Sequence, residues 1–328
     1  MNGPLPLYLN TFPGGGGPDD GPVTIRLGFV AEPVVKLTDT ATPPLYSECL
    51  ARMVVSESIL LKGGEFVEDF EANGDIGLLD VTMLDIVFDA LADQPRGCLG
   101  CNISPKTLSD RDTWNEVIKR LAARPWLAER LVLEITESCP LDEIEDVVGR
   151  LSTARRLGCR LAVDDFGAGF ATPARLRRLD IEWDIIKLDR SCLGDPRKRD
   201  ESCERLAYYL SLAGRLAPFV VVEGIETSQY IDLACEAGAL YGQGWAFDGP
   251  VLPRFATPDA ETGARLAAAL LSHGSIVRPV TSISNAGVAP ARHALGSDRK
   301  PNYLLSKVDH LGDRVRALVA RARSGGAV

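Results

Sequence analysis

Short β-rich runs alternate with longer helix-like segments from Thr24 to about residue 271, and this alternation constrains the fold more than any other feature. It is typical of a mostly parallel sheet whose strands are joined by helices. Eight runs are expected to be strands, which favours a closed (β/α)8 TIM-type barrel over an open sheet. The expected strands are 25–36, 44–53, 98–103, 130–136, 159–164, 183–188, 218–223 and 239–247.

Amphipathic stretches lie between the expected strands. In one of them, Leu141, Ile144, Val147, Val148 and Leu151 have the spacing of a helix face. The expected helices are 77–92, 110–123, 141–157, 201–216, 228–237 and, as the last barrel helix, 258–271.

The two ends of the chain differ from this central part, which we place at 23–271. Residues 1–22 are rich in Gly and Pro and predict a disordered leader. Residues 272–328 predict a C-terminal extension, in which a linker up to residue 297 precedes a basic amphipathic helix. That helix is expected to dock on the acidic barrel or on a second subunit, the alternative being a membrane surface or a partner protein. Its apolar face consists of Leu304, Val308, Leu311, Val315, Leu318 and Ala322.

Composition excludes several classes of function. A formal net charge of −9 argues against a duplex nucleic-acid binder. No apolar run approaches the roughly 18 residues of a membrane span, and no signal peptide is visible, so a cytoplasmic protein is predicted. The 8 cysteines mostly lie in apolar segments and are expected to be reduced thiols, including the lone CxxC of Cys98 and Cys101. All 3 histidines lie in the tail, which excludes histidine triads and His-ligated zinc from residues 1–272.

Polar residues stand where the expected strands end. Taken singly, each has an ordinary explanation as a helix cap or a solvated loop residue. Five carboxylates converging on one barrel mouth would repel each other unless cations compensate them, and oxygen ligands without histidine favour Mg²⁺ or Mn²⁺ over zinc. The adjacent pair Asp164 and Asp165 is suited to bridging two metals. The strand-end residues are Glu48, Asn102, Glu134, Asp164, Asp165, Lys187, Asp189, Glu223 and Gln243.

Seven ordered motifs carry a resemblance to a known family. They are Glu48-Cys-Leu, Asn102-Ile-Ser, Glu134-Ile-Thr-Glu137, Asp164-Asp165-Phe-Gly-Ala-Gly, Ile-Lys187-Leu-Asp189-Arg, Glu223-Gly-Ile-Glu226-Thr and Gly-Gln243-Gly-Trp-Ala-Phe. Over about residues 24–271 the chain resembles the EAL-domain cyclic di-GMP phosphodiesterases. The resemblance implies a modified barrel whose first strand is antiparallel, a homodimer, and hydrolysis of cyclic di-GMP to linear pGpG.

The resemblance also implies a role for each matching residue. Lys187 would orient the attacking water, and Glu223 is the candidate general base. Arg52, Gln243 and Asp189 would bind substrate, while Glu137 and Glu226 would shape the loop at 166–172. The first metal would be held by Glu48, Asn102, Glu134 and Asp164, and the second by Asp164 and Asp165, with Glu223 binding through water or nearby.

The chain departs from the family pattern at a few positions. Glu32 replaces a glutamine, Cys49 an alanine, Met53 a tryptophan and Ala168 a threonine or serine, and 54–58 lacks the usual His-Pro. A negative charge at position 32 would weaken binding of an anionic ligand unless it is protonated or turned away. The alternative function is therefore a cyclic di-GMP receptor that signals through its C-terminal extension without turnover. The presence of every metal ligand and of Lys187 favours the enzyme.

Overall fold

The structure is a computed structural model that describes residues 25–55, 59–136, 138–168, 172–247 and 251–272. Eight of its strands form a closed ring, because β1 pairs with both β2 and β9. The predicted closed barrel is thereby confirmed. The ring consists, in spatial order, of β1 (Ile25–Lys36), β2 (Tyr46–Val55), β4 (Leu99–Ile103), β5 (Leu131–Ile135), β6 (Arg160–Phe166), β7 (Ile185–Leu188), β8 (Phe219–Val222) and β9 (Tyr241–Gly242).

Strand β1 runs antiparallel to both of its neighbours in the ring, as the family resemblance implied. The remaining neighbours, from β2 through β4 to β9, pair in parallel. Antiparallel strands need only a short connection, whereas parallel strands need a crossover that is usually a helix. The chain accordingly passes from β1 to β2 without a helix.

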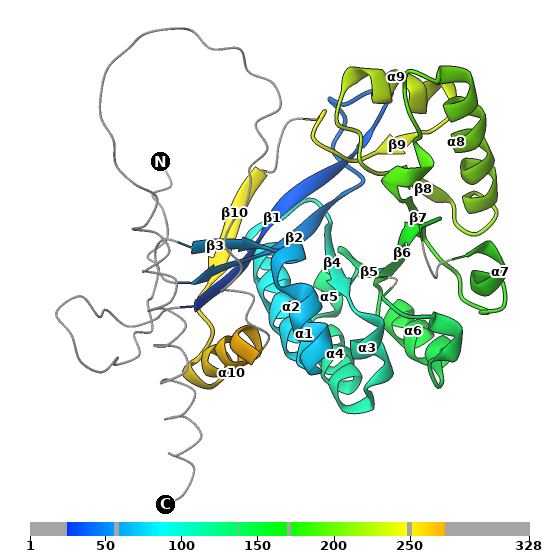
Figure 1. Ribbon diagram of the computed structural model, residues 1–328. Coiled ribbons are helices and arrows are strands. Elements are labelled where there is room, and N and C mark those ends of the chain that lie inside the picture. Colours follow the sequence, from blue (N-terminus) through cyan, green and yellow to red (C-terminus); the bar gives the residue numbers. More distant parts are fainter. Residues whose placement is uncertain (1–24, 56–58, 137, 169–171, 248–250, 273–328) are drawn as a thin grey trace, which may run out of the picture.

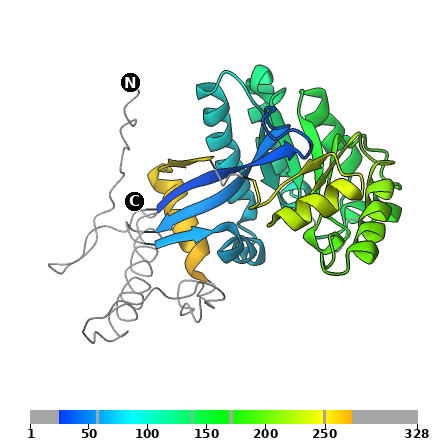
Figure 2. The same cartoon turned by 90° about the horizontal axis from the view of Figure 1, so that it is seen from above.

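The β1–β2 hairpin continues past the ring as a four-stranded antiparallel sheet (Figures 1 and 2). Two short strands that the sequence did not predict complete it: β3 (Ile59–Lys62) pairs with β2, and β10 (Val251–Ala256) pairs with β1. One face of this sheet is buried and carries Leu27 and Met53. Helix α10 (Ala260–Ser272) contacts β1 and helix α1 (Val67–Asn73) at this end of the molecule.

Helices cover the outside of the parallel part of the barrel (Figure 1). The longer ones are α2 (Ile76–Asp93), α4 (Arg111–Ala123), α6 (Val147–Arg156), α8 (Arg199–Ala213) and α9 (Ser228–Glu236). Shorter elements are α3 (Pro105–Ser109), α5 (Pro125–Ala128), α7 (Pro173–Leu176) and the 3-10 turns η1 (Gly63–Glu65), η2 (Leu141–Glu143) and η3 (Arg190–Cys192).

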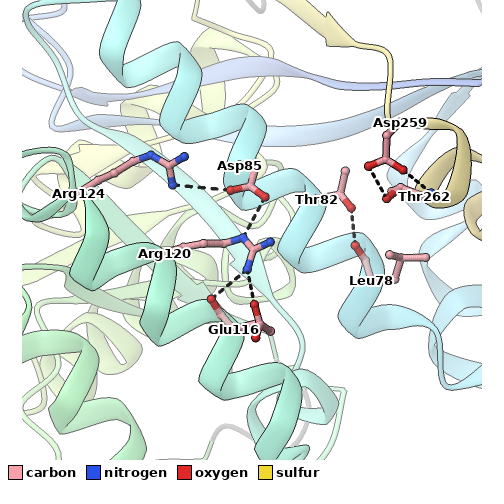
Figure 3. A network of polar contacts seen from close by, with 8 residues as sticks. All are labelled: Leu78, Thr82, Asp85, Glu116, Arg120, Arg124, Asp259 and Thr262. Carbon is pink, nitrogen blue, oxygen red and sulfur yellow. Dashed lines mark hydrogen bonds and ion pairs between the residues drawn. The ribbon is translucent and has the colours of Figure 1, made fainter. Parts of the chain in front are cut away.

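Charged side chains connect α2 to α4 beside their apolar contact, as Figure 3 shows. Arg120 of α4 donates to Asp85 of α2 at 2.9 Å and to Glu116 of its own helix at 3.0 Å. The guanidinium of Arg124 lies over the ring of Phe88 and close to Asp85. These contacts fix the helix that packs behind β4.

Two predicted elements are shorter than expected. The helix expected at 141–157 begins only at Val147, because Asp146 adopts a left-handed φ of 53° after the turn η2. The strand expected at 239–247 is limited to Tyr241–Gly242, and Gly244, with φ 146°, turns the chain away. The predicted leader 1–22 and the predicted C-terminal helix lie outside the described residues, and the domain boundaries stay a prediction. Among the described residues, no helix is long and apolar enough to cross a membrane.

Candidate active site

Side chains fill the inside of the barrel in layers. The apolar layer consists of Val34, Tyr46, Val132, Ala162, Ile185 and Val221. Because side chains alternate along a strand, the next inward-facing position lies two residues further along each parallel strand and two residues earlier on the antiparallel β1. These positions form what we call the polar layer: Glu32, Glu48, Glu134, Asp164, Lys187 and Glu223.

Lys187 lies at the centre of the polar layer, with 1% of its side chain exposed. Its Nζ is 2.8 Å from Glu48, 2.8 Å from Glu134, 3.0 Å from Asp164 and 2.7 Å from Glu223. The sequence predicted these residues from four separate motifs, and the barrel brings them together around one ammonium group.

Two amides and one phenol orient the carboxylates. Asn102 donates from Nδ2 to Glu48 at 2.8 Å, and Gln243 donates from Nε2 to the other oxygen of Glu48 at 2.7 Å. Tyr46 donates its hydroxyl to Glu134 at 2.9 Å. Sequence reasoning missed Tyr46, although its position two residues before Glu48 places it on the same face of β2.

Gly100 makes room for this arrangement. It occupies the position in β4 two residues before Asn102, where the other strands place an apolar side chain. A Cβ at Gly100 would collide with Oε1 of Glu134 and with the ring of Tyr46. The absence of a side chain at this position therefore lets Glu134 lie inside the barrel.

Burial and mutual repulsion dominate the electrostatics of the polar layer. Burial raises the pKa of Glu134 to about 8 and raises the pKa of Glu223 well above its usual value. Burial also acts to raise the pKa of Glu48, but Lys187 and the two amides outweigh it and hold that pKa below its usual value. Although burial opposes the charged form of Lys187, the carboxylates around it, Asp164 first, raise its pKa well above the ordinary value.

The donor set fits a hard divalent cation. Asp164, Asp165 and Glu223 each offer a carboxylate oxygen within 4.8 Å of the others. Asp165 adopts a left-handed φ of 53°, a region that Asp tolerates better than most residues. Within the described part of the chain, Oδ1 of Asn102 and Oε1 of Glu134 are buried and accept no hydrogen bond. Buried acceptors of this kind need a partner, and oxygen atoms are the ligands that Mg²⁺ and Mn²⁺ prefer.

The other predicted site residues lie further from Lys187. Arg52 is half-buried, and its guanidinium donates to the carbonyl oxygens of Leu50 and Ala51. Asp189 accepts from the backbone N–H of Ser191 and caps the turn η3. Glu226 forms an ion pair with Arg190 at 3.1 Å, which connects the loops after β7 and β8. Glu137 lies outside the described residues.

Glu32 faces Glu48 across the β1–β2 pair. Burial and then the charge of Glu48 raise the pKa of Glu32 above its usual value. Among the positions where this chain departs from the family pattern, Glu32 is the one in the polar layer. Its carboxyl group keeps its proton to a higher pH than an exposed glutamate does.

A buried carboxyl group lies behind Asn102. Asp80 of α2 accepts from the backbone N–H of Ser104 at 2.9 Å and from the hydroxyl of Thr107 at 2.6 Å. Ser104 also donates its hydroxyl to Glu71 of α1. Burial raises the pKa of Asp80 to about 7. Sequence reasoning missed this group, which fixes the turn that follows Asn102.

A closed barrel with an oxygen-rich acidic cluster at the carboxyl ends of its strands defines the general class of this protein: a TIM-type barrel with a candidate divalent-metal site. Residues 25–250 match the family model described as EAL domain. The chain belongs to the EAL domain family.

Individual relatives agree with this assignment. The chain is 31% identical over 225 residues to the cyclic di-GMP phosphodiesterase NbdA of Pseudomonas aeruginosa, a match that covers 67% of this chain and 28% of NbdA. The chain thus spans about a quarter of the length of the first curated relatives it matches.

Solved structures support the fold. The EAL domain protein of Listeria monocytogenes superposes with a TM-score of 0.58 at 21% identity, over 68% of this chain and 88% of that one. The FimX EAL domain of Pseudomonas aeruginosa, bound to c-di-GMP, gives a TM-score of 0.55 at 23% identity, over 69% and 90% of the two chains.

Proposed function

We propose that this chain hydrolyses cyclic di-GMP to linear pGpG in a reaction that depends on two Mg²⁺ or Mn²⁺ ions. One observation carries the proposal: a buried ammonium, Lys187, lies between 2.7 and 3.0 Å from four carboxylates that come from separate parts of the barrel. Relatives such as NbdA, named as cyclic di-GMP phosphodiesterases, support the choice of substrate.

The residues that would hold the cations divide into two groups that share Asp164. Glu48, Asn102, Glu134 and Asp164 would hold the first cation, and Asp164 and Asp165 the second, with Glu223 binding through water or nearby. Two such cations would act as Lewis acids that lower the pKa of a water molecule and neutralise charge on a phosphodiester. Four carboxylates around one ammonium, with Asp165 next to Asp164, leave excess negative charge, which divalent cations would compensate.

The protein's own groups then manage the proton and the developing charge. The water oxygen forms a bond to phosphorus as the bond from phosphorus to the 3′ oxygen breaks. Glu223 accepts the proton of the water, the 3′ oxygen takes up a proton from solvent as it leaves, and Glu223 then releases its proton to solvent. Nζ of Lys187 orients the water and offsets negative charge on the phosphoryl oxygens. Asn102 and Gln243 hold Glu48 in place.

Residues around the polar layer would hold the substrate. Arg52 offers a planar set of donors that suits a phosphate, and Gln243 and Asp189 offer hydrogen bonds at the mouth. Glu226, through Arg190, and Glu137 would shape the neighbouring loop. Binding at these residues orients the phosphodiester toward the carboxylates.

The test is a chromatographic assay of cyclic di-GMP with Mg²⁺, Mn²⁺, Ca²⁺ or a chelator. We expect pGpG to accumulate with Mg²⁺ or Mn²⁺ and not with the chelator. Glu48→Gln is expected to abolish turnover while thermal unfolding stays cooperative, because a central ligand is lost. Glu68→Gln, on the exposed side of α1, is the matched control and should behave as wild type. Intact cyclic di-GMP that binds without product under every metal would replace the enzyme by a receptor.

The proposal also covers the location and the oligomeric state of the protein. We place the protein in the cytoplasm as a homodimer, with its basic C-terminal helix docked on the acidic barrel or between subunits. Light scattering on the full chain and on a chain ending at residue 297 tests this. Identical masses would exclude dimerisation through that helix.

A further inference from the structure

The four-stranded sheet outside the barrel has two different faces. Odd-numbered residues of β1 and β2, such as Leu27 and Met53, are buried against the helices. The even-numbered face is the continuation of the polar layer, since Glu32 and Glu48 lie on the same side of the hairpin as Gly28 and Arg52. Gly28 and Arg52 are four positions along their strands from Glu32 and Glu48, so this part of the even-numbered face begins about 13 Å from Glu48 and adjoins the mouth of the site.

An aromatic residue from β10 lies on this face. The strand register places Phe255 opposite Gly28, and Gly28 opposite Arg52. A Cβ on Gly28 would meet the ring of Phe255, so the glycine lets this ring lie across β1. The guanidinium of Arg26, two residues along the same face, lies 5.7 Å from the centre of the ring. Phe255 lies beyond residues 25–250, which the family model matches.

Three basic residues lie on the same face of the sheet as this ring. Arg26 is half-buried, Arg52 lies across the strand pair, and Lys62 of β3 pairs with Arg52 and is exposed. Burial lowers the pKa of Arg52, while the carboxylates of Glu32 and Glu65 act to raise it. Glu65, in the turn η1, accepts a hydrogen bond from the backbone N–H of Lys62 at 2.7 Å. An aromatic ring beside a guanidinium, with two further cations on the same face of the sheet, is a combination that binds a nucleotide, because bases stack on aromatic or guanidinium planes and phosphates pair with cations.

We infer that Phe255, Arg26 and Lys62 form a subsite for the half of the cyclic dinucleotide that extends outside the barrel mouth. The inference rests on the proposed function, since it assigns the ligand of the same site. The purine stacks on the platform of Phe255 and Arg26, and the second phosphate lies toward Arg52 and Lys62. The subsite governs affinity for a dinucleotide and takes no part in bond cleavage.

The experiment compares two substrates in Phe255→Ala. Cyclic di-GMP has a second base and phosphate, whereas bis(4-nitrophenyl) phosphate offers a single phosphodiester without a nucleobase. We expect KM for cyclic di-GMP to rise about tenfold with kcat little changed, as loss of one stacked base predicts. Hydrolysis of bis(4-nitrophenyl) phosphate should keep its wild-type rate.

Arg254→Ala is the matched control. Arg254 precedes Phe255 on β10 but lies on the opposite face, where it pairs with Asp93 at 2.7 Å. It should leave KM for cyclic di-GMP unchanged. Lys62→Glu provides a second variant at an exposed position and should raise KM for cyclic di-GMP several-fold.

The outcomes separate the subsite from the proposed function. Equal KM values for cyclic di-GMP in wild type, Phe255→Ala and Lys62→Glu would overturn the subsite while the phosphodiesterase stands. Equal loss on both substrates would also overturn it, because the effect would then be on the barrel as a whole. A wild-type protein that hydrolyses neither substrate would contradict the proposed function alone. The subsite would then be supported by weaker binding of cyclic di-GMP to Phe255→Ala in calorimetry, and overturned by equal binding.

Discussion

The two sides of this barrel differ in how they supply the site. Each strand of the parallel wall, β4 to β8, ends in at least one predicted site residue, and every one of those residues matches a family motif. Strand β6 contributes two adjacent ones, Asp164 and Asp165. The hairpin wall, β1 and β2 with β3 and β10, contributes Glu48 and Arg52 but also carries Glu32, Cys49 and Met53, three of the departures from the family pattern.

The difference shows where this fold tolerates change. Cys49 and Met53 lie on the buried odd-numbered face of β2, so their replacement alters packing against helices and leaves the polar layer untouched. Glu32 alone among the three enters the polar layer. We therefore expect substitutions in the parallel wall to affect turnover and substitutions in the hairpin wall, apart from its metal ligand Glu48, to affect substrate affinity.

The largest effect is expected from Lys187→Met in the parallel wall. The variant removes the one cation among four buried carboxylates, so kcat should fall by roughly a thousandfold. Without added metal, the free energy of unfolding should fall by about 3–5 kcal/mol, because breaking a buried ion pair leaves uncompensated charge. Assays with cyclic di-GMP and thermal unfolding in chelator and in Mg²⁺ measure both.

Lys106→Met is the control for this variant. Its Nζ donates to a backbone carbonyl on α1 in an exposed contact. If Lys187→Met kept wild-type kcat, the division of roles between the two walls would be wrong.

An intermediate effect is expected from Gly100→Ala. The new methyl group would displace the carboxylate of Glu134 and the ring of Tyr46 without removing any ligand. Overpacking of this kind costs about 1–3 kcal/mol of stability, and displacement of Glu134 should weaken metal binding. Gly64→Ala, where an added Cβ meets nothing within 4 Å, is the matched control. Chemical denaturation and Mg²⁺ titration of activity distinguish the two variants, and identical curves would contradict the role given to Gly100.

The same division explains what the sequence could predict. Each strand of the parallel wall is an apolar run that ends in a polar residue, and such runs predict both the strand and the site. In the hairpin wall, β3 has only four residues and β10 contains Pro253, which is confined to edge strands. Neither strand has a periodic pattern strong enough to identify it. The sequence therefore did not predict the four-stranded outer sheet, which only the structure shows.

The geometry of the site could likewise be predicted only in part from the sequence. The ends of the predicted strands were enough to predict the residues around Lys187. The orientation of each carboxylate, however, depends on hydrogen bonds from other side chains, such as those of Tyr46 and Asn102. The need for a glycine at Gly100 depends on Glu134 and Tyr46, which lie on different strands. Contacts of that kind are set by the three-dimensional packing of neighbouring strands and leave no mark in a single sequence.

The smallest effect is expected from Glu32→Gln, which tests the hairpin wall. Because burial raises the pKa of Glu32, its carboxyl group is neutral at low pH and gains its negative charge as pH rises through that raised value. At a pH below that raised value, the two proteins should therefore have similar KM values for cyclic di-GMP. At a pH above it, the wild-type KM should exceed that of Glu32→Gln by a few-fold, because an ionised carboxylate then lies beside an anionic substrate, partly offset by Arg52.

The ratio of the two KM values is the informative quantity, since titration of the other carboxylates is common to both proteins and cancels. Their kcat values should stay within a factor of about two, because Glu32 is not among the residues that hold Lys187. A ratio that stays constant with pH would mean that Glu32 does not change charge near the substrate. A change confined to kcat would mean that a hairpin-wall residue other than Glu48 takes part in turnover, and the proposed difference between the two walls would be wrong.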